Sequence, residues 1–66
     1  MSIYSAIKDI AKDKNKSVYR IERDLGYVPG KISKWDDSMP RADSLQEVAD
    51  YLGVTSSFIL NKSKEN

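Results

Sequence analysis

The chain has 66 residues, of which 39% are hydrophobic and 32% are charged, and its net charge is +1. A chain of this length forms one domain with a small core, and its apolar content and low net charge exclude a disordered chain. It contains no cysteine and no histidine, which excludes disulfides, cysteine-based zinc sites, thiol nucleophiles and Ser-His catalysis. We therefore expect no enzyme, no cofactor, no metal and no small-molecule substrate, and a cytoplasmic location.

The first two predicted helices follow from apolar periodicity and capping residues. Residues 2–14 carry apolar residues at steps of three and four, with Ser2 as the N-cap. Residues 17–25 keep the same spacing after Ser17, which is the second N-cap. Gly26 follows the last apolar residue of that helix, where a left-handed residue commonly ends a helix.

Residues 28–36 are predicted to form the third helix. Pro29 suits the first helical position, because its missing N–H has no partner there. Ile32 and Trp35 lie three residues apart and are expected to face the core, which places the two lysines of this segment on the opposite face. Gly30 weakens the helix by about 1 kcal/mol relative to alanine.

The second half of the chain contains two more predicted helices. Residues 37–41 combine Asp, Ser, Met, Pro and Arg and are predicted to form a loop. Residues 42–52 form the fourth predicted helix, which Gly53 ends. Residues 56–61 form the fifth, a short helix capped by Thr55.

These elements predict an all-α fold, a compact bundle of five short helices. No segment alternates with period two, so we expect no strand, and no apolar stretch approaches the roughly 18–20 residues that span a membrane. We expect one domain over residues 1–61 and a flexible C-terminal tail over residues 62–66.

The charge is unevenly distributed along the chain. Residues 1–35 hold eight basic and four acidic residues, a net charge of +4, whereas residues 36–66 hold three basic and six acidic residues, a net charge of −3. The basic half can face a polyanion, although charge alone favours a solvated helical surface.

Two short helices that meet at Gly26 have the layout of a helix-turn-helix. In its order of residues the stretch 17–60 resembles the Xre/Cro-type helix-turn-helix family of phage repressors and bacterial regulators. The matching residues are Ser17, Ile21, Leu25 and Gly26, then Ile32, Ser33, Lys34 and Trp35, then Pro40, and finally Leu45, Val48, Ala49, Leu52, Gly53, Val54 and Thr55. The resemblance implies a lambda repressor-like DNA-binding domain, and a transcription regulator that binds double-stranded operator DNA as a homodimer.

The chain departs from the family pattern at three places. Glu22 replaces the small alanine usual in the second helix, and we expect its carboxylate to be partly exposed or paired with Lys31 or Arg23, because an unpaired buried charge is costly. Residues 28–30 are Val, Pro and Gly where many members have polar side chains. Residues 36–38 are Asp, Asp and Ser where the family has Glu-x-Gly.

The helix-turn-helix resemblance also implies which residues contact DNA, since its second helix enters the major groove and its first helix crosses the backbone. The groove-facing candidates are Val28, Pro29, Gly30, Lys31, Ser33 and Lys34, with the two lysines foremost. The backbone-facing candidates are Ser17, Val18 and Tyr19, together with the flanking Lys14, Lys16 and Arg41. Trp35 is expected in the core, and Tyr27 is expected to pack or to bind phosphate.

Dimerisation is expected because a single small module covers little DNA. The last helix offers Phe58, Ile59 and Leu60 as the self-contact, unless the chain is the N-terminal part of a longer repressor that dimerises elsewhere. A protein-interaction module on the same fold, of the antitoxin or antirepressor kind, is the alternative function.

Overall fold

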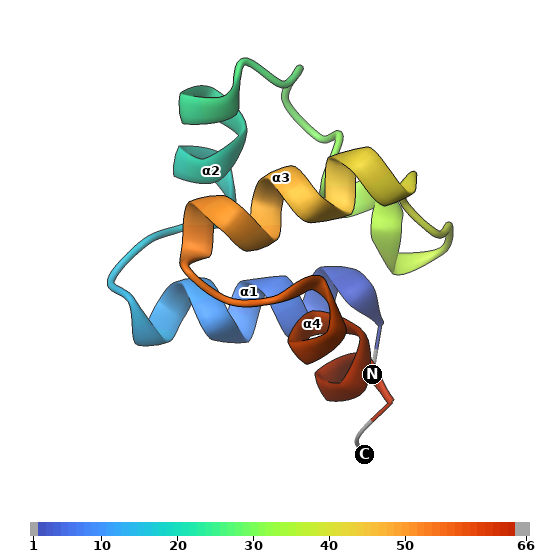
Figure 1. Cartoon of the computed structure of the whole chain (residues 1–66). Coiled ribbons are helices and arrows are strands. Elements are labelled where there is room, and N and C mark those ends of the chain that lie inside the picture. Colours follow the sequence, from blue (N-terminus) through green and yellow to red (C-terminus); the bar gives the residue numbers. More distant parts are fainter. Residues whose placement is uncertain (1, 65–66) are drawn as a thin grey trace.

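The structure is a computed structural model that describes residues 2–64, and within this range it is all-helical (Figure 1). The elements are α1 (Ile3–Asp13), α2 (Val18–Leu25), a 3-10 helix η1 (Ser33–Asp36), α3 (Ala42–Leu52) and α4 (Ser56–Ser63). The all-α class is confirmed. The expected count of five short helices is wrong, because the described residues form four α-helices and one 3-10 helix.

The predicted capping residues start and end the helices. Ser2, Ser17 and Thr55 each accept a hydrogen bond from a backbone N–H three residues later, at 3.0–3.1 Å. Gly26 and Gly53 adopt left-handed conformations, with φ of 73° and 74°, directly after α2 and α3. Local sequence signals therefore determine these helix ends.

The C-terminal helix is longer than expected. It ends at Ser63, so residues 62 and 63 belong to α4 and the expectation of a flexible tail from residue 62 is wrong. Ser63 Oγ donates a hydrogen bond of 2.6 Å to the carbonyl of Leu60, inside the last turn. Residues 65 and 66 of the expected tail lie outside the described residues.

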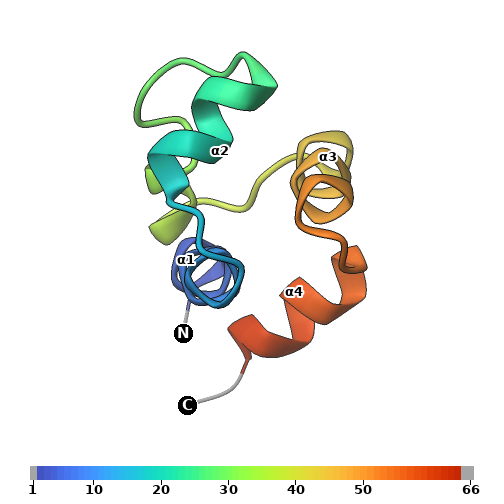
Figure 2. The same ribbon diagram turned by 90° about the vertical axis from the view of Figure 1, so that its left-hand side faces the viewer.

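The core lies between the helices. In Figure 2, α1 is viewed nearly along its axis, with α2 above it, α4 to one side and α3 across the core. The buried apolar side chains come from every element, and they are Ile3, Ala6, Ile7, Ile10, Ala11, Ile21, Ile32, Trp35, Leu45, Val48, Ala49, Leu52 and Ile59. Trp35 is thus confirmed as a core residue.

The third predicted α-helix, residues 28–36, does not form. Residues 29–32 form turns, and only Ser33–Asp36 is helical, with 3-10 geometry. Gly30 has φ of 90°, which no right-handed helix accommodates. Pro29 accordingly lies in a turn, not at the start of a helix. Ile32 and Trp35 still reach the core, because residues three apart share one face of a 3-10 helix.

Candidate nucleic-acid interface

The candidate interface consists of α2 and the segment that follows it, residues 27–34, which we call the 27–34 loop. Gly26 reverses the chain, and the N–H of Tyr27 donates to the backbone carbonyl of Glu22 at 2.8 Å. Two short-range bonds then close the loop on itself, from Lys31 N–H to the Val28 carbonyl at 3.1 Å and from Lys34 N–H to the Gly30 carbonyl at 3.3 Å. In Figure 1 the loop, drawn in green, leads from the end of α2 to η1.

The side chain of Glu22 fixes the backbone of this loop. The residue is only 5% exposed, and its two carboxylate oxygens accept the N–H groups of Gly30 at 3.2 Å and Ile32 at 2.9 Å. The expectation that Glu22 is exposed or paired with Lys31 or Arg23 is wrong, since backbone donors satisfy the charge. The departure from the family's alanine was the sequence signal that this position is special.

Tyr27 connects the loop to α3. Its hydroxyl donates to Glu47 Oε1 at 2.8 Å, and its ring meets Trp35 edge to face, with centroids 6.5 Å apart. Burial, followed by the hydrogen bond to Glu47, raises the pKa of Tyr27 to about 12. Tyr27 therefore packs within the fold, which agrees with the first of its two expected roles.

The Tyr27 ring also carries a cation on its face. Lys31 Nζ lies 3.9 Å from the centroid of the Tyr27 ring, and the lysine is half-buried. The charge stays at the surface of the loop while the alkyl stem packs. Lys34 is exposed and projects from the beginning of η1.

A second set of contacts joins α2 to α3. The hydroxyl of Tyr51 donates to Asp24, which also forms an ion pair with Arg20 at 3.2 Å. The hydrogen bond from Tyr51 lowers the pKa of Asp24, and the same bond raises the pKa of Tyr51. Lys16 Nζ lies 5.3 Å from the Tyr51 ring centroid. Asp24, near the end of α2, and Lys16, just before the helix, therefore both contact Tyr51 of α3.

The outer surface of this region is apolar and basic. Tyr19 is 66% exposed and Val28 is 67% exposed, and Pro29 is exposed as well. A groove of about 210 Å³ between α2 and the loop is lined by Tyr19, Glu22, Arg23, Tyr27 and Pro29. The segment 25–35 contains two lysines and no acidic residue.

The other backbone-facing candidates differ in accessibility. Ser17 is exposed, but its hydroxyl already caps α2, and Val18 is half-buried against the core. Lys14 is exposed between α1 and α2. Arg41 follows η1 in the sequence. It is exposed and forms an ion pair with Asp43 at 3.6 Å. Ser33 is exposed, and its Oγ donates to the Gly30 carbonyl at 2.8 Å.

The structure separates the three expected dimerisation residues. Ile59 is fully buried in the core, so its expected role in a self-contact is wrong. Phe58 is 50% exposed, and Leu60 is partly buried against the core. Three consecutive residues of a helix point in different directions, so they cannot all face one partner. Because all three are apolar, the sequence did not indicate which of them faces the core.

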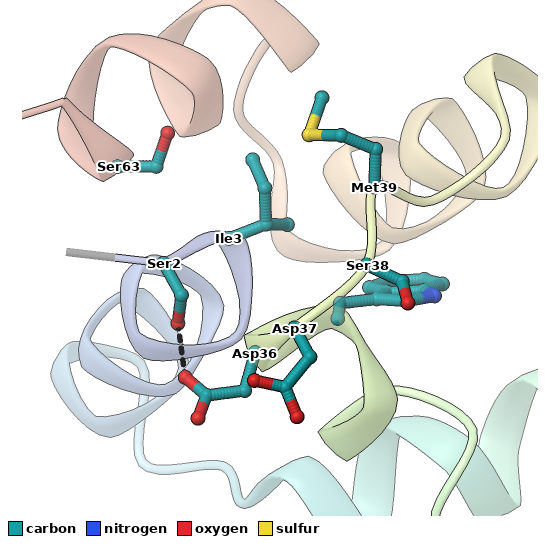
Figure 3. Close-up of a pocket in the computed structure, with 8 residues that line it drawn as sticks. Ser2, Ile3, Asp36, Asp37, Ser38, Met39 and Ser63 are labelled. Atoms are coloured by element: carbon teal, nitrogen blue, oxygen red, sulfur yellow. Dashed lines mark hydrogen bonds between the residues drawn. The ribbon is translucent and has the colours of Figure 1, made fainter.

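A second cavity, also of about 210 Å³, lies where α1 begins, η1 ends and α4 ends (Figure 3). Beside this cavity, Ser2 Oγ donates a hydrogen bond of 2.6 Å to Asp36 Oδ1. Figure 3 shows Asp37 next to Asp36. Among residues 2–64, no three potential metal-ligating side chains lie together. In the same range, no helix is both long and apolar enough to cross a membrane.

Comparisons with known proteins found no family model, no curated protein and no solved structure that matches the chain.

Proposed function

We propose that this protein is a transcription regulator of the phage-repressor type that binds double-stranded DNA through the N-terminal end of α2 and the 27–34 loop. The two segments act as a helix-turn-helix whose second element is a tight loop followed by one 3-10 turn. A large part of the support comes from the resemblance of the sequence to the Xre/Cro family, which covers both segments.

One structural observation carries the proposal. The Glu22 carboxylate, which lies directly against the loop, is buried and accepts two backbone N–H groups, so its charge is satisfied inside the fold. The cations on the loop are then those of Lys31 and Lys34, and the exposed Arg23 of α2 lines the groove beside Pro29. A surface with several basic side chains suits a polyanion, and phosphate contacts supply most of the affinity of such proteins.

The contacts divide between the two segments. Lys34 is exposed and reaches either a phosphate or the O6 and N7 atoms of guanine. Tyr19 is 66% exposed on the first turn of α2, and its hydroxyl contacts the sugar-phosphate backbone of the DNA. Lys14 and Lys16 precede α2 and add phosphate contacts.

Two copies bind related half-sites in this proposal, as proteins of this architecture do. Phe58 is the most exposed apolar side chain of α4 and is the contact we assign to the partner copy. Such a dimer doubles the DNA surface that one module covers.

A protein-interaction module remains the second candidate. The apolar side chains of Tyr19 and Val28 are about two-thirds exposed, and Tyr19 lines the groove on α2. A protein partner would contact these apolar side chains, whereas DNA would contact the lysines.

Fluorescence anisotropy with a labelled duplex tests the proposal. Replacing Lys31 and Lys34 with alanine should weaken binding and reduce the slope of log K against log salt by about 1 for each phosphate that the variant no longer neutralises. The matched control replaces Lys62 and Lys64, at the end of α4, and should leave the slope unchanged. Equal slopes for both double variants contradict the proposed interface.

A further inference from the structure

The tip of the 27–34 loop consists of two apolar residues that point away from the core. Val28 is 67% exposed, which is unusual for a β-branched side chain in a chain whose isoleucines are all buried. Pro29, next to it, is exposed as well. The apolar surface of the tip has no cover within residues 2–64.

The backbone donors that follow Val28 in the loop are already engaged. Proline has no N–H, and the N–H groups of Gly30 and Ile32 are both bound to the Glu22 carboxylate. The N–H of Lys31 is bound to the carbonyl of Val28. The tip therefore meets a ligand mainly through its carbon atoms.

Basic side chains lie close to the apolar tip. Lys31 follows it in the loop, Lys34 lies in η1, and Arg23 lines the same groove as Pro29. The positive charge of these side chains is complementary to a polyanion. An apolar tip beside them therefore suits a polyanion that presents an apolar group. In duplex DNA the major groove contains one such group, the C5-methyl of thymine.

We propose that Val28 and Pro29 bind thymine methyl groups in the major groove, and that this contact contributes sequence preference. The inference rests on the proposed DNA binding and adds the chemistry of the base contact. The loop is pre-organised for it, since Gly30 holds φ of 90° and the Glu22 carboxylate fixes the backbone on either side of Lys31.

A pair of duplexes that differ only in this methyl group tests the inference. One is alternating dA and dT, and the other has deoxyuridine in place of every thymine. The intact chain should bind the thymine duplex about fourfold more tightly for each methyl group buried, and Val28→Ala should remove most of that preference. Met39→Ala is the matched control, because Met39 is 70% exposed on a different loop, and it should keep the preference.

The outcomes separate the two proposals. Equal binding of both duplexes by the intact chain overturns the methyl contact but leaves DNA binding in place. A preference that is undiminished in Val28→Ala also overturns the contact assigned to Val28. Failure to bind either duplex at low salt overturns the proposed function, and the methyl contact with it.

Discussion

Replacing Glu22 with alanine tests how the 27–34 loop is held. The carboxylate is 5% exposed and accepts two N–H groups, from Gly30 at 3.2 Å and from Ile32 at 2.9 Å. Glu22→Ala removes both acceptors, and the Ile32 N–H, which is buried, has no route to water. The variant should therefore be less stable, and the loop should lose its single conformation.

The size of the effect follows from these two bonds. A hydrogen bond to a charged group contributes about 1.5–3 kcal/mol, and the Gly30 N–H is only partly buried, so water replaces part of its bond. We expect a loss of about 3 kcal/mol. A domain of this size has a free energy of unfolding of about 3–10 kcal/mol, so the loss is a large share of it. Glu22→Gln keeps one acceptor and should lose about half as much.

Thermal unfolding followed by the fluorescence of the buried Trp35 measures the change. At about 4–8 °C per kcal/mol, Glu22→Ala should lower Tm by about 12–24 °C, with Glu22→Gln between it and the unchanged chain. Asp9→Asn is the control, since Asp9 is an exposed carboxylate on α1. A Glu22→Ala variant as stable as the Asp9→Asn variant would refute the account of the loop.

The remaining predictions concern single side chains. Gly30→Ala should lower the free energy of unfolding in urea by about 1–3 kcal/mol, because an alanine is strained at φ of 90° even though its Cβ would meet only Ser33 Oγ, at 3.7 Å. The pKa of Tyr27, raised to about 12, should fall in Glu47→Gln, and tyrosinate absorbance should show this. Folding keeps the Tyr27 proton bound, so its contribution to stability is complete below pH of about 10 and is lost as the pH rises towards 12. Ile59→Ala should destabilise the fold by about 2–5 kcal/mol, whereas Phe58→Ala should change dimerisation in sedimentation velocity more than it changes Tm.

Each of these has a result that contradicts it. A Gly30→Ala variant of unchanged stability would mean that the loop relaxes without strain. An unchanged Tyr27 titration in Glu47→Gln would remove Glu47 as a cause of the raised pKa. An Ile59→Ala variant as stable as the intact chain would contradict its place in the core. A destabilised Phe58→Ala variant with unchanged self-association would place Phe58 in the fold, not in a dimer contact.

The helices with local signals were predictable from the sequence. Ser17 and Thr55 act as caps through their own hydroxyls, and Gly26 and Gly53 end helices through their own φ angles. In each case the cause and the effect lie within a few residues. The helix bounded by residues 42 and 52 was accordingly predicted to the residue.

The loop was not predictable because its cause is distant in the sequence. Ile32 and Trp35 are three residues apart, a spacing that suits both an α-helix and a 3-10 helix, so the pattern could not separate them. The N–H groups of Gly30 and Ile32 donate to the Glu22 carboxylate, eight and ten residues away, and no local pattern indicates these two bonds. A buried acceptor of this kind overrides local propensity.

The sequence indicated which residues of the candidate interface to consider, but it did not indicate which contacts hold them in place. Tyr19 is exposed on α2, and Val28 and Lys34 are exposed in the segment that follows it. The bond between Tyr27 and Glu47 joins residues 20 positions apart, and no local pattern indicates it. The run of apolar residues in α4 likewise hid that Ile59 faces the core.

The most direct test of the account is selection from a pool of random DNA duplexes at moderate salt, followed by sequencing of the retained molecules. We expect a recovered site with two related half-sites about one helical turn apart, rich in thymine where the loop enters the groove. The variant with Lys31 and Lys34 replaced by alanine should recover no such site. A pool that the intact chain does not retain at all would contradict DNA binding and favour a protein partner for the same surface.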